Sequence, residues 1–531
     1  MATKKLQVWI PLLFSMVMIA GMLVGYKIKG NMPGRDLFYT IRQKPVQEVI
    51  NLIENKYVDK VNMDSLTSNT VGNMLSRLDP HSIFLPANEL QDMKEDMEGK
   101  FYGIGIEYNI FNDTIYVLNV LKGGPADKAG LQVGDKFIKA GDSEIAGVKI
   151  TPANIKQLLR GDAGTKAEIT VMRGKELKNF TIIRGAIPLY SLDAAYIIHG
   201  NTGYIRLNKF SDNTYKEFMT AMEKLKKEGM QSLVLDLRDN GGGILSEATN
   251  IADEFLDDDK MITYTVGEHS PRKEYHAQRE GIFESGKLMV LADEGTASAS
   301  EVLIGALQDW DRATIIGRRT FGKGLVQEQY ELSDGSGLRL TVARYYTPLG
   351  RSIQKSYSNG NEAYQQELTG RFHDGELLYA DSIKHTNGKP YKTKNGKVVY
   401  SGGGITPDIF VAFDTSSVSK EMTRAYIKGT INNFVYQNYI NNKNAFSTFR
   451  SPSEFEKNYS IDDVTWDRFK KFAFKDSLDL SNLSDRDKVE LVKQLKVITA
   501  RQIWRSEGLY EVSNANDLMV KRALEEIEHS K

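Results

Sequence analysis

The sequence predicts a multidomain chain that combines α/β and β domains with a helical C-terminal region. Its 531 residues are too many for one hydrophobic core, so roughly three or four domains are expected. Short apolar strands alternate with helical stretches between about residues 188 and 350, which indicates an α/β core. Helical spacing marks the tail after Phe413, where Ser484 is a candidate N-cap ahead of an apolar face. Such a face is more typical of packing within the protein than of binding a partner.

The N-terminus predicts export. Lys4 and Lys5 precede an apolar stretch from Val8 to Tyr26. About nineteen residues at 1.5 Å rise would span ~29 Å, enough for the hydrocarbon core of a bilayer. Positive charge ahead of the stretch favours a cytoplasmic N-terminus with the rest translocated. No clear small-x-small cleavage site is present, so we expect an inner-membrane anchor facing the periplasm, with a cleaved signal peptide and a periplasmic protein as the alternative.

Composition excludes several classes of function. The 69 basic and 69 acidic residues balance, and long basic runs are absent, so no nucleic-acid surface is expected. The absence of cysteine removes disulfides, thiolate metal sites and a lipoprotein anchor. The seven histidines are scattered and form no H-E-x-x-H motif, so neither a metal site nor a cofactor is predicted.

Two segments carry the candidate chemistry: TASASE at 296–301 and FGKGLVQ at 321–327. A serine hydroxyl is a poor nucleophile until a neighbouring base takes its proton. A lysine can be that base when burial or a nearby positive charge lowers its pKa from about 10.4 towards roughly 7–8. Gln327 follows Lys323 by four residues and would project from the same face, where its amide could hold the amine in position. The pair Ser298 and Lys323 therefore predicts a serine hydrolase with a lysine base.

Other interpretations of these segments are weaker. A Ser-Ala run is also common at the start of a packed helix, and Gly-Lys-Gly is common in exposed turns. Residues 317–323 match the opening of a phosphate-binding loop, but Gly324 stands where Ser or Thr would hold magnesium, and a strand-like pattern follows. A conventional esterase is disfavoured because the chain has no G-x-S-x-G elbow.

A glycine run supplies candidate oxyanion donors. The apolar strand at 232–238 leads directly into Asn240-Gly-Gly-Gly243, ahead of a helical stretch from Leu245. Glycines at a strand-to-helix turn leave backbone N–H groups pointing outwards, as an oxyanion hole requires. In isolation the run would fit a flexible turn or a phosphate loop equally well.

Together these segments resemble the carboxyl-terminal processing proteases, also called tail-specific proteases. The family's catalytic residues match three positions in type and spacing: Ser298, Lys323 and Gln327. The resemblance implies oxyanion donors at the N–H of Ala299 and of a glycine in the pair Gly242 and Gly243. Motifs like LDPHS at 78–82 and GITPDI at 404–409 extend the resemblance over some three-quarters of the chain.

A second module resembles a PDZ domain in the family's circularly permuted form. Its candidate carboxylate-binding loop is Tyr102, Gly103, Ile104, Gly105 and Ile106, and a matching turn follows at 124–135. Such a loop can present N–H groups to a peptide's terminal carboxylate while the strand edge pairs with the peptide. A tight hairpin without a ligand is the alternative.

The resemblance implies a crotonase-like ββα-type protease core with an inserted PDZ domain. The expected regions are an N-terminal anchor or signal peptide at 1–30, a helical region at 37–95, the PDZ domain at 96–186, the protease core at 187–413 with an insertion at 354–400, and a helical C-terminal domain at 414–531. The insertion is expected to be solvated, with a substrate-facing lid as the alternative.

The expected function is that of a serine endopeptidase that processes or degrades exported proteins and recognises apolar C-terminal tails. Its partners would be protein substrates and the membrane, with a homo-oligomer or an adaptor left open. A peptide-binding scaffold without turnover is the alternative from another class.

Overall fold

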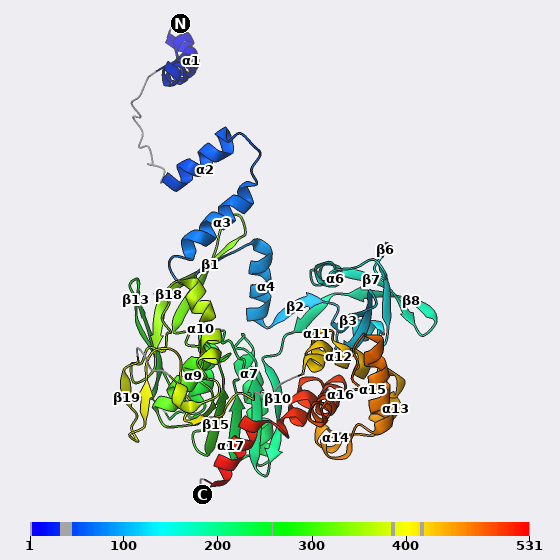
Figure 1. Ribbon diagram of the computed structural model, residues 1–531. Helices are drawn as coiled ribbons and strands as arrows, with labels where there is room; N and C mark the ends of the chain where they lie inside the picture. Colours follow the sequence, from blue (N-terminus) through cyan, green and yellow to red (C-terminus); the bar gives the residue numbers. More distant parts are fainter. Residues whose placement is uncertain (1–2, 32–44, 258, 384–387, 415–418, 530–531) are drawn as a thin grey trace. The chain divides into compact units, whose positions relative to one another are not determined.

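The computed structural model describes residues 3–31, 45–257, 259–383, 388–414 and 419–529 (Figure 1). The chain divides into two compact units, Met1–Asn73 and Met74–Lys531. The helices that begin in the first unit are α1 (Thr3–Asn31), α2 (Pro45–Lys56) and α3 (Met63–Leu75). The first residues of the predicted helical region, 37–44, lie outside the described residues. Among the residues that the structure describes, no helix is both long and apolar enough to cross a membrane, so the predicted anchor is unconfirmed.

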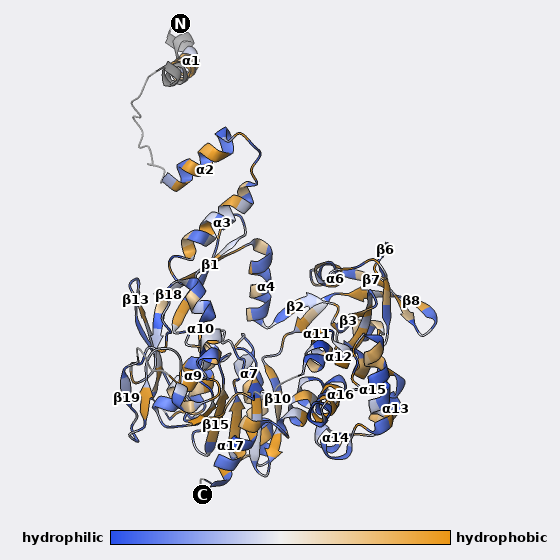
Figure 2. Cartoon of the chain, viewed as in Figure 1, coloured by the Kyte–Doolittle hydropathy of each residue, from blue (hydrophilic) through white to orange (hydrophobic). Residues whose placement is uncertain are grey.

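A six-stranded sheet forms the centre of the second unit. Its strand order is β10-β11-β12-β15-β16-β21, and every pair is parallel except the antiparallel pair of β10 and β11. The strands are β10 (Leu192–His199), β11 (Thr202–Leu207), β12 (Ser232–Asp236), β15 (Lys287–Ala292), β16 (Thr314–Gly317) and β21 (Ile409–Phe410). Their mostly apolar sequences suit burial on both faces, as in β15 of Figure 2.

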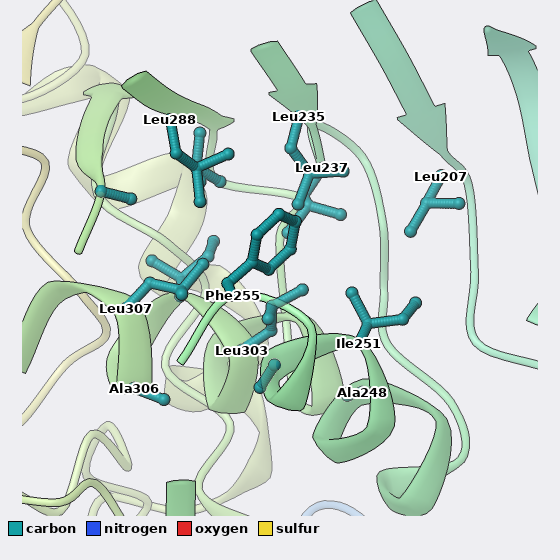
Figure 3. Close-up of a cluster of buried hydrophobic side chains, with 14 of the residues drawn as sticks. Leu207, Leu235, Leu237, Ala248, Ile251, Phe255, Leu288, Leu303, Ala306 and Leu307 are labelled. Carbon is teal, nitrogen blue, oxygen red and sulfur yellow. The ribbon is translucent and has the colours of Figure 1, made fainter. Parts of the chain in front are cut away.

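Helices cover both faces of this sheet. On one face lie α7 (Thr214–Lys227), α8 (Leu245–Asp253) and α9 (Ala299–Asp309). Figure 3 shows the buried cluster there, in which Leu235, Phe255 and Leu303 belong to one packed core. On the other face, Met519 and Val520 of α17 (Leu518–His529) are buried against the strands. The α/β core predicted from the sequence is thus present.

A second sheet contains the strand that directly follows the candidate lysine in the chain. Its strand order is β1-β18-β13-β14, and β17 pairs with β18. The strands are β1 (Ile83–Leu85), β13 (Met261–Gly267), β14 (Ser270–His276), β17 (Leu325–Glu331) and β18 (Gly337–Tyr346). Lys323 stands two residues before β17, and Gln327 is the third residue of that strand.

The insertion predicted at 354–400 is largely solvated, as expected, but it is folded and buries several side chains. It forms α10 (Asn361–His373), a short 3-10 helix (Ala380–Ser382), β19 (Pro390–Lys392) and β20 (Val398–Tyr400). Tyr364, Leu377 and Val399 are buried. The guanidinium of the buried Arg371 donates to the backbone carbonyl of Thr320 at 2.9 Å. The stretch therefore supports the backbone that leads into Lys323.

The PDZ module is a separate small sheet with a core of its own. Its strand order is β3-β4-β5-β7-β8, with β6 paired to β5. The elements are α4 (Ala87–Glu98), which precedes the module, β2 (Lys100–Gly103), β3 (Ile106–Phe111), β4 (Thr114–Val120), α5 (Pro125–Ala129), β5 (Lys136–Ala140), β6 (Ser143–Glu144), α6 (Pro152–Leu159), β7 (Lys166–Arg173), β8 (Glu176–Ile183) and β9 (Gly185–Pro188). The antiparallel pair β2 and β9 joins its two ends.

The C-terminal region is helical, as the sequence predicts. Its helices before α17 are α11 (Lys420–Ile427), α12 (Thr430–Asn441), α13 (Lys443–Phe446), α14 (Pro452–Asn458), α15 (Asp463–Lys475) and α16 (Asp485–Asn514). Leu491 and Leu495 of α16 are buried in its core, and Ser484 caps α16 by accepting a hydrogen bond from the N–H of Asp487. Bonds from Tyr436 to Val117 and from Asn514 to Tyr196 tie the region to the PDZ sheet and to the central sheet.

Candidate active site

The catalytic and oxyanion residues predicted from the sequence line one cleft of about 540 Å³. The cleft brings together the end of β12, the start of α9 and the start of β17. The six predicted residues that line it are Gly242, Gly243, Ser298, Ala299, Lys323 and Gln327.

Ser298 adopts a strained backbone conformation at the N-cap of α9. Its φ of 57° and ψ of −117° place a residue with a side chain in a region that favours glycine. Such strain persists only where the surroundings impose it, and it is common at active sites. The first N–H groups of α9 point towards the same place, so the helix dipole adds positive potential beside the Ser298 hydroxyl.

Lys323 has the electrostatics of a general base. Burial, together with the nearby positive charge of Arg339, lowers the pKa of Lys323 to about 8. A large share of the amine is therefore neutral near neutral or mildly alkaline pH, as proton abstraction requires. Tyr345 Oη lies 2.7 Å from the backbone oxygen of Lys323 and 3.1 Å from that of Ser298, so one buried hydroxyl holds both segments.

Glu301 joins the serine segment to the lysine segment. Its fully buried carboxylate accepts hydrogen bonds from the backbone N–H groups of Ser298 at 2.9 Å, Lys323 at 2.8 Å and Gly322 at 2.8 Å. The hydroxyl of Thr320 donates to the same carboxylate at 2.5 Å. Burial raises the pKa of Glu301 to about 7 against these four donors. The spacing Ser-x-x-Glu is a capping-box signal from which this contact could have been predicted.

Two backbone N–H groups are available to an oxyanion. Within the described residues, no acceptor is bonded to the N–H of Ala299 or of Gly243. The N–H of Gly242 already donates to Asn240 Oδ1 at 2.9 Å, which favours Gly243 as the donor of the glycine pair. A Cβ at Gly242 would lie 2.8 Å from the Ala299 nitrogen and 2.8 Å from Ser298 Cβ. Only a glycine leaves this space open.

The predicted contacts of Gln327 and of the dyad itself are not formed. The Gln327 amide donates to Thr341 Oγ1 at 3.4 Å, and Thr341 in turn donates to Asp79 of the LDPHS segment at 3.0 Å. Across the described part of the chain, no hydrogen bond joins Ser298 Oγ to Lys323 Nζ. Catalytic hydrogen bonds in structures without substrate are often long and tighten only in the complex. The orienting role of Gln327 stays a prediction.

The predicted carboxylate-binding loop lies at the entry to β3. Ile104 and Gly105 stand between β2 and β3, with Gly105 at a φ of 78°, and Ile106 begins β3. No acceptor among the described residues is bonded to the N–H of Gly105, whereas the backbone next to it is engaged in an antiparallel bridge between Gly103 and Arg160. Gly103 belongs to β2, and Tyr102 is exposed at the surface. A glycine N–H without an acceptor at the start of an edge strand suits a terminal carboxylate.

Three sequence profiles match the chain. Peptidase family S41 matches residues 201–360, and the PDZ domain matches residues 103–183. A family of unknown function (DUF8443) matches residues 422–505 of the C-terminal region.

A carboxy-terminal-processing protease of Bartonella bacilliformis is 33% identical over 356 residues, which are 65% of this chain and 81% of that protein. The chain belongs to the carboxy-terminal-processing protease family. A CtpA-like serine protease of Staphylococcus haemolyticus is 35% identical over 312 residues, 58% of this chain, and the match spans 62% of its length. A solved photosystem II D1 C-terminal processing protease is 27% identical, covering 71% of this chain and 88% of that one, with a TM-score of 0.35.

Family membership confirms the resemblance inferred from the sequence, and the family is one of serine-type peptidases. Two residues of the cleft could not be found from sequence. Arg339 and Tyr345 lie on β18, beyond any motif, and only the pairing of β17 with β18 brings them to Lys323.

Proposed function

We propose that this chain is a serine endopeptidase with a Ser298–Lys323 dyad, and that it cleaves exported proteins whose C-terminal tails its PDZ domain binds. One observation carries the proposal. Ser298 in a strained backbone, Lys323 with a lowered pKa and two N–H groups that have no acceptor among the described residues line the same cleft.

In the first step, the neutral amine of Lys323 accepts the proton of the Ser298 hydroxyl as its oxygen attacks the scissile carbonyl carbon. The C=O bond becomes a C–O⁻ oxyanion, which the N–H groups of Ala299 and Gly243 would hold. Donors fixed before the reaction stabilise this charge without reorganisation, and each is worth about 10²–10³ in kcat.

In the second step, the Lys323 ammonium gives its proton to the leaving nitrogen, and the C–N bond breaks to leave an acyl-serine. Water then attacks the ester with Lys323 again as base, which returns Ser298 to its hydroxyl form. Glu301 and Tyr345 act through the backbone, since their side chains hold the serine segment and the lysine segment by hydrogen bonds to backbone atoms.

The location remains a proposal as well. Lys4 and Lys5 ahead of the apolar stretch at 8–26 favour export, with the protease domains at or near the outer face of the inner membrane. Fractionation of cells that express the full chain, with protease protection of intact spheroplasts, tests this. Protection by the inner membrane would contradict it.

The proposed reaction is tested with an unfolded protein that ends in free apolar residues and the same protein with an amidated C-terminus. The full chain is compared with Ser298→Ala and Lys323→Ala. We expect cleavage only by the parent chain, with the free end preferred. Cleavage by a folded Lys323→Ala protein would contradict the mechanism. Binding without cleavage by all three proteins would favour a peptide-binding scaffold.

A further inference from the structure

A groove of about 680 Å³ runs along the edge of β3, and two different regions of the chain form its walls. β3 is the terminal strand of its sheet, paired on one side with β4. The first wall belongs to the PDZ module, with the apolar residues Ile104, Ile106, Ile155 and Leu159. The second wall belongs to α12 and α16 of the C-terminal region: Asn432, Tyr436, Ile498, Arg501, Gln502 and Arg505.

The PDZ core and the C-terminal helices lie on opposite faces of β3. Ile106, Tyr108 and Ile110 pack against the PDZ core, so the alternating residues Glu107 and Asn109 point the other way. Those two contact the C-terminal helices. Asn109 donates to Asn433 Oδ1 at 3.3 Å, and Glu107 forms an ion pair with Arg505.

The C-terminal wall is fixed to the PDZ sheet. Gln502 of α16 donates to the backbone oxygen of Leu118 at 3.0 Å, and Tyr436 of α12 donates to that of Val117 at 3.2 Å. Arg505 lies at a kink of α16 and has a φ of 64°, a strained conformation for a residue with a side chain. Strain of this kind points to a local constraint at this wall of the groove.

Of the described basic residues that line the groove, one has no carboxylate within ion-pair distance. Lys156 pairs with Asp92, Arg160 pairs with Glu95, and Arg505 pairs with Glu107. Arg501 is exposed, and no carboxylate of the described residues lies within ion-pair distance of it. A guanidinium binds a carboxylate through two parallel hydrogen bonds, which gives geometric selectivity as well as affinity.

We propose that α16 makes this groove a composite peptide site in which Arg501 selects an acidic side chain near the substrate's C-terminus. The inference rests on the proposed reading of substrate tails by the PDZ domain. A peptide that extends the sheet at β3 has side chains on alternate faces. With its last side chain in the apolar pocket of Ile104, Ile155 and Leu159, its second and fourth residues from the end face α16. The region of unknown function at 422–505 thereby becomes part of the substrate-binding machinery.

The test measures binding alone, with the full chain carrying Ser298→Ala so that nothing is cleaved. Fluorescein-labelled ten-residue peptides with an apolar last residue carry Glu, Gln or Lys at the second and fourth positions from the end, and binding is followed by anisotropy. We expect the Glu peptide to bind ~10-fold more tightly than the Gln peptide and the Lys peptide to bind most weakly. Arg501→Ala should remove most of this difference, and Arg501→Glu should reverse it.

Arg486→Ala is the matched control, because Arg486 is an exposed arginine of the same helix that does not line the groove, and it should keep the preference. Equal binding of the three peptides, or a preference that survives Arg501→Ala combined with Arg505→Ala, would overturn the inference. Tail reading is judged separately with an amidated Glu peptide. If the three peptides bind equally well but still need a free C-terminus, only the selection by Arg501 is overturned. If amidation causes no loss of affinity, the PDZ domain does not recognise the C-terminus, and the inference is overturned as well.

Discussion

The Oε2 atom of Glu301 lies 2.8 Å from the backbone nitrogen of Lys323. The same atom accepts a hydrogen bond from the backbone N–H of Ser298 at 2.9 Å. One buried oxygen thus sets the separation of the proposed nucleophile and base, although it touches neither reacting side chain.

Replacing Glu301 with glutamine should therefore impair catalysis without removing a catalytic group. Both carboxylate oxygens of Glu301 accept hydrogen bonds, but an amide has only one oxygen. The NH₂ group of the glutamine would face other hydrogen-bond donors and displace the serine segment or the lysine segment. A shift of about 1 Å at a reacting group can cost ~10²-fold in rate. We expect kcat to fall by about that factor with KM little changed, measured by steady-state peptide cleavage. A variant with unchanged kcat would show that Glu301 only stabilises the fold.

The rate of cleavage should rise with pH. The folded protein lowers the pKa of Lys323 to about 8, and only the neutral amine can accept the serine proton, so kcat/KM is expected to increase through pH 8 and then level off. Arg339→Gln removes the positive charge beside Lys323, so the midpoint should move to higher pH. Arg344→Gln is the control on the same strand, since Arg344 is exposed and does not line the cleft. An unmoved midpoint in Arg339→Gln would contradict this electrostatic account.

Gly242→Ala should nearly abolish turnover. The added Cβ would lie 2.7 Å from the Ala297 oxygen and 2.8 Å from the Ala299 nitrogen, at a φ of 94° that side chains rarely adopt. This Cβ would crowd the N–H of Ala299, and loss of one oxyanion donor costs about 10²–10³ in kcat. A Cβ on the neighbouring Gly241 would meet nothing within 4 Å, so Gly241→Ala should lose far less. Equal losses in both variants, measured with one peptide substrate, would contradict the assigned geometry.

Asp236 should make the central sheet sensitive to acid. Burial alone would raise the pKa of this carboxyl, but the guanidinium groups of Arg238 and Arg206 outweigh burial and hold the pKa well below its usual range. The unfolded chain therefore takes up the proton first, so this stabilisation is present above about pH 4 and is lost as the pH falls.

Asp236→Asn should lower the free energy of unfolding of the sheet by about 3–5 kcal/mol at pH 7, because two buried cations lose their carboxylate. Hydrogen exchange of the β11 and β12 amides measures this loss. Asp212→Asn changes an exposed carboxylate and should shift it by less than about 0.5 kcal/mol. Unchanged exchange in Asp236→Asn would refute the claim.

The predicted motifs could be found because each is encoded over a few residues. Ser298, Lys323 and the glycines at 242 and 243 stand in short segments whose residue types suit a nucleophile, a base and an oxyanion turn, and the structure gathers these segments around one cleft. The buried contacts of the stretch at 354–400 could not be predicted for the converse reason. Its polar composition predicts exposure to solvent. In the structure, however, the Arg371 guanidinium donates hydrogen bonds to the buried backbone carbonyls of residues 319 and 320.

By itself, the sequence determined the α/β core, the helical C-terminal region and the candidate dyad, since hydrophobic periodicity and local motifs follow from neighbours along the chain. Only the tertiary structure decided which charge lowers the pKa of Lys323 and which helix faces the peptide groove. Arg339 comes to Lys323 through the pairing of β17 with β18, and Arg501 comes to β3 across nearly 400 residues of sequence. Contacts of this kind depend on how whole elements pack, and no local pattern in the chain records them.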